Sequence, residues 1–71
     1  MKLGNSLRKK RFEYHEISQQ DLANAVGVSR ITIHPIETGK FNPSALLALK
    51  IARFFNLNVE EIFYLVDEED I

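Results

Sequence analysis

Apolar residues recur along the chain at the three- and four-residue spacing of amphipathic helices, and no segment alternates in the manner of a half-buried strand. Serine or asparagine precedes each periodic stretch, where its side chain can cap a helix, and glycine ends two of the stretches. The pattern therefore predicts five helices with short connections. They are expected from Asn5 or Ser6 to about Tyr14, from Ser18 to Gly27, from Ser29 to Gly39, over about Ala45–Phe55 after a Ser44 cap, and briefly after Asn58.

The same spacing indicates which side chains form the core. Each helix is expected to bury one face, and the core positions on the second to fifth helices are Leu22, Ala23, Val26, Ile33, Ile36, Leu46, Leu49, Ile51, Ala52, Phe55 and Ile62. A chain of 71 residues has the length of one small domain. We therefore predict an all-α fold, with one domain over residues 1–66 and an acidic C-terminal tail over residues 67–71.

Composition narrows the functional class. The chain has no cysteine, which is typical of a reducing, cytoplasmic setting, and no apolar run approaches the ~20 residues of a membrane span. The polar stretch 1–10 lacks the apolar segment of a signal peptide. His15 and His34 are far apart in sequence, and the three glycines form no phosphate-binding loop. We expect a binding module rather than an enzyme, with no metal and no cofactor.

Charge is distributed unevenly along the chain. Residues 1–53 carry all nine lysines and arginines and four acidic residues, a net charge of +5, whereas residues 54–71 carry six acidic residues and a net charge of −6. A chain polarised in this way can present one basic face to a polyanion although its overall charge is −1. The acidic end is interpreted as a solvated tail.

The segment 18–40 has the features of a helix-turn-helix. Two short predicted helices are joined by a turn of three to four residues that contains Gly27, whose lack of a Cβ permits a left-handed backbone. Ala23 is small where the second helix is expected to cross the first. Val28, Ile33 and Ile36 are placed to fill the wedge between them. The N-terminal side chains of the second helix would then project outward, as entry into a DNA major groove requires.

With these features the chain resembles the Cro/CI-type, or XRE-family, helix-turn-helix DNA-binding proteins. The resemblance is carried by SQQDLANAVGVSR at 18–30, NPS at 42–44 and ALKIARFF at 48–55, and it extends over about residues 5–65. It implies a five-helix, lambda-repressor-like domain that binds double-stranded DNA, usually as a homodimer, with the third helix in the major groove. Carried over by position, the family's DNA contacts fall on Gln19, Ser29, Arg30, Ile31, Thr32, His34, Lys40 and Asn42.

The side chains at these positions suit different contacts. Arg30 can donate a bidentate pair of hydrogen bonds to guanine, whereas Ile31 can contact only the methyl group of thymine. The polar residues Gln19, Ser29 and Lys40 suit phosphate oxygens, which position a protein without specifying sequence. Structural alternatives stay open at this point: Ser29 caps a helix with or without DNA, and Arg30 is also an ordinary type of surface charge.

The resemblance also pairs Arg11 with Glu37, as an ion pair that orients the third helix against the first. This alignment places one extra residue after Tyr14, in the connection to the second helix. The basic run Arg8–Arg11 has two interpretations, a solvated helix face or a patch beside the DNA backbone.

Pro35 departs most from the pattern. It lies inside the predicted third helix, where proline removes one backbone hydrogen bond and its ring crowds the preceding turn. It also disfavours helical backbone angles at His34. The sequence therefore predicts a helix that is kinked or divided near His34 and Pro35. Two consequences are possible: the bend re-aims His34 toward DNA, or the DNA-binding surface is impaired and the domain binds a protein partner.

Four consecutive apolar residues near the C-terminus exceed what one helix buries against one core. This surplus predicts a two-fold dimer interface, formed by Phe63, Tyr64, Leu65 and Val66. The alternative is that Phe63 and Leu65 close the core while Tyr64 reaches solvent. The sequence thus favours a sequence-specific transcriptional regulator, and specifically a repressor that acts as a homodimer on a palindromic operator. The second hypothesis is an antitoxin-like interaction module that uses this C-terminal face.

Overall fold

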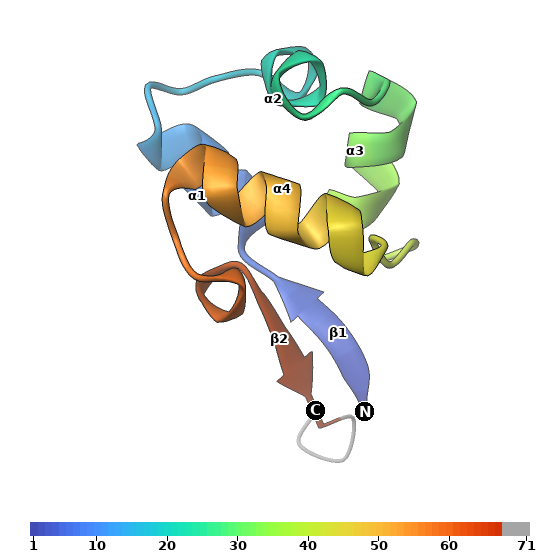
Figure 1. Cartoon of the computed structure of the whole chain (residues 1–71). Coiled ribbons are helices and arrows are strands. Elements are labelled where there is room, and N and C mark those ends of the chain that lie inside the picture. Colours follow the sequence, from blue (N-terminus) through green and yellow to red (C-terminus); the bar gives the residue numbers. More distant parts are fainter. Residues whose placement is uncertain (68–71) are drawn as a thin grey trace.

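The structure is a computed structural model that describes residues 1–67 of the chain. Within these residues it contains four α-helices, one 3-10 turn and two strands (Figure 1). The helices are α1 (Leu7–Glu13), α2 (Gln19–Val26), α3 (Arg30–Glu37) and α4 (Ala45–Phe55), the 3-10 turn is η1 (Val59–Glu61), and the strands are β1 (Lys2–Asn5) and β2 (Phe63–Val66).

The helices enclose one hydrophobic core. Helix α2 lies at the top of the view in Figure 1, seen nearly along its axis, and packs against both α3 and α4, while α1 lies behind α4. Among the described residues, the largest fully buried side chains come from every helix and from the turn before β2. They are Leu7, Leu22, Ile33, Ile36, Ile51 and Ile62. The burial predicted for the second and third helices, at Leu22, Ala23, Val26, Ile33 and Ile36, is confirmed.

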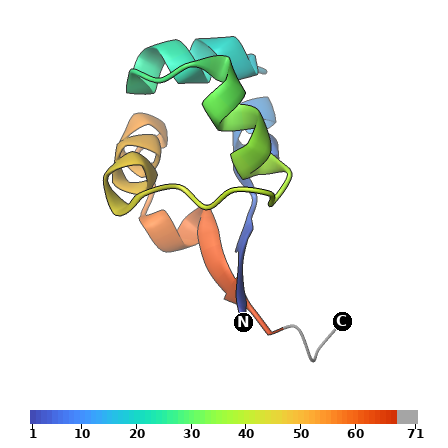
Figure 2. The ribbon, with the colours of Figure 1, turned by 90° about the vertical axis from the view of Figure 1, so that its right-hand side faces the viewer.

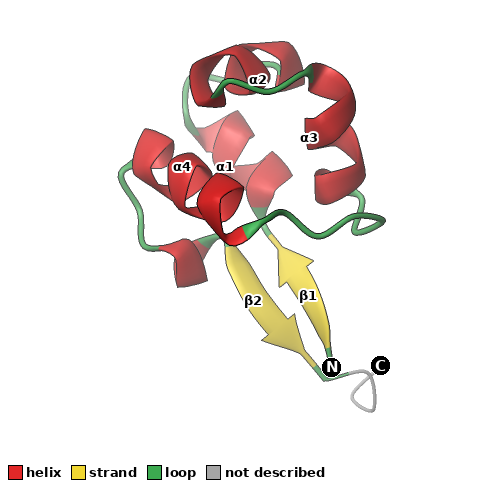
Figure 3. Cartoon of the chain, turned by 45° about the vertical axis from the view of Figure 1, so that its right-hand side comes forward, coloured by secondary structure: helices red, strands yellow, loops and turns green. Residues whose placement is uncertain are grey.

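The all-α prediction is wrong in one respect, because the two ends of the domain form an antiparallel pair of strands. Lys2 faces Val66 and Asn5 faces Phe63 in this pair, which projects from the helices in Figure 3. The expected fifth helix is a single 3-10 turn, Val59–Glu61. Asn58 occupies the N-cap position of this turn, and its backbone N–H donates to the Glu61 carboxylate at 2.7 Å. Ile62 ends this turn, with its N–H bonded to the carbonyl of Val59, and β2 begins at Phe63.

Gly4 explains how the strands fit together. A Cβ at this position would lie 2.6 Å from Tyr64 Cε1 and 2.6 Å from Val66 Cγ2, closer than van der Waals contact allows. The missing side chain therefore makes room for the Tyr64 ring, and the Tyr64 hydroxyl donates to the carbonyl of Asn5 at 3.3 Å.

The phase of α4 also differs from the prediction. Leu46 and Leu49 are 65% and 58% exposed, so their placement in the core is wrong. The buried stripe instead follows Leu47, Ile51 and Phe55, which lie four residues apart on one face of the helix. Helix α4 thus presents two leucines to solvent.

The connection between α1 and α2 has a strained backbone. His15 and Glu16 both adopt the left-handed region, with φ of 59° and 53°, which side chains with a Cβ disfavour. The Tyr14 ring lies 5.0 Å from that of His15 and 5.2 Å from that of Phe54, so aromatic contacts hold this turn against α4.

The C-terminal tail predicted at 67–71 falls almost entirely outside the described residues, which include only Asp67 of it. None of the helices in residues 1–67 combines the length and the apolar character that crossing a bilayer requires.

Candidate nucleic-acid interface

A tight turn joins α2 to α3. Gly27 ends α2 in the left-handed conformation, with φ of 77°, and the backbone N–H of Val28 donates to the carbonyl of Ala23 at 3.0 Å. Ala23 is completely buried, as the close crossing of the two helices requires. Ile33 and Ile36 anchor the inner face of α3 in the core. The geometry expected of a helix-turn-helix is therefore present.

The opposite face of α3 is at the surface. Figure 2 shows this helix facing the viewer, with α2 above it and the following loop crossing below. Arg30 begins α3 and is exposed, Ile31 is 76% exposed, and His34 follows one turn later. These side chains belong to the half of the helix that the fold leaves free to enter a groove.

A charged hollow lies on one side of α3 and joins three helices. It is lined by Arg8, Arg11, Gln19, Arg30, His34, Glu37 and Thr38, and we call it the polar hollow. Gln19 and Arg30 thus share one surface, although they come from different helices. The cations Arg8 and Arg30 contribute its positive charge from α1 and α3.

Gln19 is held in place within this hollow. Its amide nitrogen lies 3.1 Å from His34 Nδ1 and donates to Glu37 Oε1 at 3.2 Å. Both amide hydrogens are therefore engaged when His34 Nδ1 is unprotonated. This contact between Gln19 and His34 was not anticipated from the sequence, because the residues lie 15 positions apart on different helices.

The ion pair between Arg11 and Glu37 is present and forms part of the lining of the polar hollow. Arg11 Nε donates to Glu37 Oε2 at 2.6 Å and a second guanidinium nitrogen donates to Oε1 at 3.0 Å, a bidentate geometry. Arg11 also donates to the carbonyl of Ile17 at 2.8 Å. The hydrogen bond with Glu37 raises the pKa of Arg11, so this residue stays charged. The pair connects α1, the turn before α2, and the end of α3.

A second hollow lies on the other side of α3 and is mostly apolar. It is lined by Ser29, Ile31, Thr32, Pro35, Lys40 and Phe41, and we call it the apolar slot. Phe41 lies in the loop after α3 and is 57% exposed. Its side chain lines this hollow together with Pro35. The sequence pattern did not identify Phe41 as a site residue. The feature that could have identified it is an aromatic side chain in an otherwise polar loop.

Pro35 does not divide the helix, so the predicted division near His34 and Pro35 is wrong. Helix α3 is continuous from Arg30 to Glu37, and the N–H of Thr38 donates to the carbonyl of His34 at 3.1 Å. Proline removes only the bond to the carbonyl of Ile31, a residue on the exposed face where water can replace it. Beyond the helix, the Pro35 carbonyl accepts from the N–H groups of Lys40 and Phe41.

Ser29 occupies the capping position of α3, but its hydroxyl makes no capping hydrogen bond. It lies instead 3.5 Å from Thr32 Oγ1. By contrast, Ser18 accepts from the N–H of Asp21 at 2.9 Å, in the capping box that the sequence predicted. The Ser29 hydroxyl therefore does not cap α3, and its polar neighbour is the Thr32 hydroxyl.

These two serines support a direct comparison. Ser18→Ala is expected to lower the free energy of unfolding by about 1 kcal/mol, because it removes a cap from α2. Ser29→Ala is expected to change it by less than about 0.5 kcal/mol. Urea unfolding followed by circular dichroism measures both values, and equal losses for the two variants would show that Ser29 caps its helix after all.

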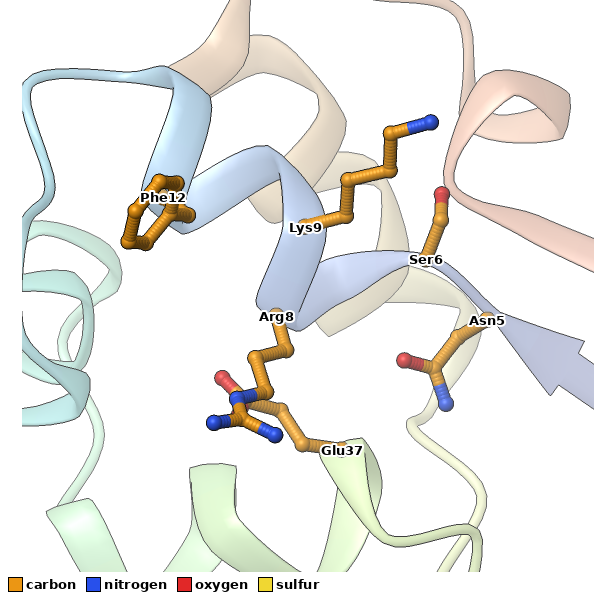
Figure 4. A pocket seen from close by; sticks show the side chains of 6 residues that line it. All are labelled: Asn5, Ser6, Arg8, Lys9, Phe12 and Glu37. Atoms are coloured by element: carbon orange, nitrogen blue, oxygen red, sulfur yellow. The ribbon is translucent and has the colours of Figure 1, made fainter.

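The basic run on α1 divides into paired and unpaired charges. Lys10 lies 3.6 Å from Glu13, and Arg11 is paired with Glu37. Arg8 and Lys9 are exposed and make no ion pair among those found in residues 1–67. Figure 4 shows Arg8 extending from α1 toward Glu37, while Lys9 and the exposed Phe12 point elsewhere. Arg8 therefore adds to the surface beside α3.

The loop residues Lys40 and Asn42 are both exposed. Lys40 reaches the apolar slot, whereas Asn42 lines neither hollow. The predicted dimer residues lie on β2 rather than on a helix. Phe63 is buried in the core, while Tyr64 and Leu65 are 45% and 70% exposed and Val66 is partly buried.

Known proteins share this arrangement. Residues 9–62 match the helix-turn-helix family model. A helix-turn-helix-type transcriptional regulator of Methanocaldococcus jannaschii is 53% identical over 55 residues, which are 78% of this chain and 83% of that protein. The helix-turn-helix-type transcriptional regulator YgzD of Bacillus subtilis is 47% identical over 58 residues, 82% of this chain and 83% of its own.

A solved structure agrees with this relationship. The restriction-modification controller protein C.AhdI from Aeromonas hydrophila superimposes with a TM-score of 0.69 at 31% sequence identity, and the match covers 78% of each chain. The similarity spans the helices that carry the polar hollow and the apolar slot.

Proposed function

Because this chain belongs to the XRE family of helix-turn-helix proteins, which are DNA-binding transcriptional regulators and not enzymes, we propose that it is a repressor that binds a palindromic operator as a homodimer. One observation carries the proposal. The exposed first turn of α3 places Arg30 beside Gln19 and Arg8 on one cationic surface. A rigid helix with this surface suits insertion into a major groove.

Arg30 is assigned to guanine in the major groove. Its guanidinium is exposed at the N-terminal end of α3, the end that enters the groove in helix-turn-helix proteins. His34 is placed one turn further along the same face. Ile31 and Thr32 are assigned to the remaining base edges, on the side of the apolar slot.

The phosphate contacts are assigned to residues around α3. The hydroxyl of exposed Ser29 makes no capping bond, and Lys40 and Asn42 are exposed in the loop after α3. When His34 Nδ1 is unprotonated, Gln19 uses both amide hydrogens within the protein, and its backbone N–H at the first position of α2 is then the better phosphate donor. Arg8 extends this set, although the resemblance did not include it.

The homodimer is assigned to β2. Leu65 is exposed on one face of this strand, Tyr64 and Val66 lie on the other face against Gly4, and the outer edge of β2 has no strand partner within residues 1–67. Phe63 shares the face of Leu65 and is buried in the core. Open strand edges pair readily with a second copy. A two-fold dimer would set the two α3 helices about 34 Å apart, on half-sites one helical turn apart.

The test is selection of bound duplexes from a random DNA pool by the full-length protein. The expected result is a palindromic sequence with half-site centres about 10 base pairs apart, and repression of a reporter promoter that contains it. Sedimentation at micromolar concentration is expected to give a dimer that Leu65→Lys dissociates. Recovery of unrelated sequences, or activation of the reporter, would contradict the proposal.

Arg30→Ala is expected to weaken binding to the selected operator by about 5- to 150-fold, the value of one bidentate contact to guanine. Binding to unrelated duplex DNA should fall only slightly. Arg53→Ala is the matched control, because Arg53 is also exposed but lies on α4, in a separate hollow with the C-terminal end of α2. Fluorescence anisotropy at fixed salt measures the operator affinity of the unsubstituted protein and of both variants. Equal losses of affinity for the two variants would show that Arg30 makes no base contact.

A further inference from the structure

The apolar slot has a composition that phosphate binding does not explain. Ile31 is 76% exposed and Phe41 is 57% exposed, and Pro35 lines the slot with them. None of these three side chains can donate a hydrogen bond to DNA. They nevertheless line a hollow on the face of α3 assigned to the major groove, where exposed apolar surface needs an apolar partner.

The slot is also fixed in shape. The carbonyl of Pro35 accepts from the N–H of Lys40 at 2.9 Å, from the N–H of Phe41 at 3.2 Å and from the hydroxyl of Thr38 at 3.2 Å. The bonds from Lys40 and Phe41 fasten the loop to the C-terminal turn of α3, and the bond from Thr38 lies at the end of that turn. Lys40 and Phe41 are therefore held beside Ile31 before any ligand arrives, which lowers the entropic cost of binding.

The major groove offers one apolar group, the C5-methyl of thymine, and thymine carries the hydrogen-bond acceptor O4 next to it. The slot matches both features. Its walls are apolar, and the ammonium group of Lys40 at its edge can only donate hydrogen bonds. The six lining residues include no carboxylate. Cytosine presents a donor amino group in place of O4, which the lysine does not complement.

On the premise that α3 binds the major groove as proposed above, we propose that the apolar slot binds the C5-methyl group of a thymine. Ile31, Pro35 and Phe41 enclose the methyl group, and Lys40 faces the O4 edge. Since Arg30 directly precedes Ile31 on the helix, the thymine lies in the same half-site as the guanine that Arg30 contacts.

The experiment uses the full-length protein and its selected operator. Each thymine of a half-site is replaced in turn by deoxyuridine, which removes only the methyl group. At one or two positions, affinity is expected to fall about threefold to fourfold, the value of one buried methyl group. Ile31→Ala should bind the thymine operator more weakly and lose the difference between thymine and uracil at those positions.

The control is Leu46→Ala, which removes an exposed leucine of α4 and should keep the full preference for thymine. A third duplex carries 5-methylcytosine opposite guanine at the sensitive position; it should bind no better than cytosine. Equal rescue by 5-methylcytosine would overturn the assignment to thymine. If the operator binds tightly but no uracil substitution matters, the slot is not a methyl site, whereas failure to select any operator would overturn the proposed function and the slot with it.

Discussion

Ile33→Ala is expected to lower the free energy of unfolding by about 2–5 kcal/mol. Ile33 is completely buried on the inner face of α3, the helix that carries Arg30, and belongs to the core cluster shared with α2 and α4. Its truncation leaves a cavity in a domain with little stability to spare, because small domains bury a limited fraction of their surface. Thermal unfolding followed by circular dichroism should show a midpoint lower by more than about 10 °C.

Ile31 provides the matched control, since it is the same residue type two positions earlier on the same helix. It is 76% exposed, so Ile31→Ala should change the free energy of unfolding by less than about 0.5 kcal/mol. The pair of variants separates the inner face of α3 from its outer face. Comparable destabilisation by both would mean that Ile31 is covered in solution, which would contradict its role at the DNA surface.

The helices that position the site could be predicted because their signals are local. Ser18 and Asp21 form a capping box within one turn, and Gly27 stops α2 in the conformation that its missing Cβ allows. Leu22, Ala23 and Val26 repeat at helical spacing and are all buried. Each of these features depends on residues fewer than five positions apart, so the sequence pattern determines them without knowledge of the fold.

The strands and the phase of α4 could not be predicted in the same way. Each residue of β1 pairs with a residue about 60 positions away, and four residues are too few to show alternation. Phe63–Val66 consists of residues with high strand propensity, but their common apolar character conceals which face is buried. In α4, the run from Ala45 to Leu49 is apolar at every position, so periodicity alone does not decide which leucines face the core.

The sequence predicted which residues share the candidate DNA-binding surface, but not the contacts that these residues make with one another. The spacing between Gln19 and Arg30 across the Gly27 turn brings both to one surface, as the helix-turn-helix pattern indicates. The hydrogen bonds of Gln19 to His34 and Glu37, and the closure of the apolar slot by Phe41, depend on how α2, α3 and the loop pack together. These tertiary contacts decide which atoms remain free for DNA.

Glu37→Gln is expected to lower the free energy of unfolding by about 3 kcal/mol. The substitution keeps the shape of the side chain but leaves the Arg11 guanidinium without its counter-charge, where the side chains of Arg11 and Glu37 are only 15% and 4% exposed. Removing one partner of a buried pair costs about 3–5 kcal/mol, and the partial exposure of Arg11 favours the lower end. Urea unfolding measures the loss.

Glu13→Gln tests the same chemistry at the surface. The pair between Lys10 and Glu13 spans 3.6 Å on α1 with Glu13 52% exposed, so its loss should cost less than about 0.5 kcal/mol. Glu37→Gln should also weaken operator binding, because Glu37 holds both Arg11 and Gln19 beside α3. If Glu37→Gln were as mild as Glu13→Gln in both measurements, burial would not strengthen the inner pair, and α3 would be held against α1 by its apolar contacts alone.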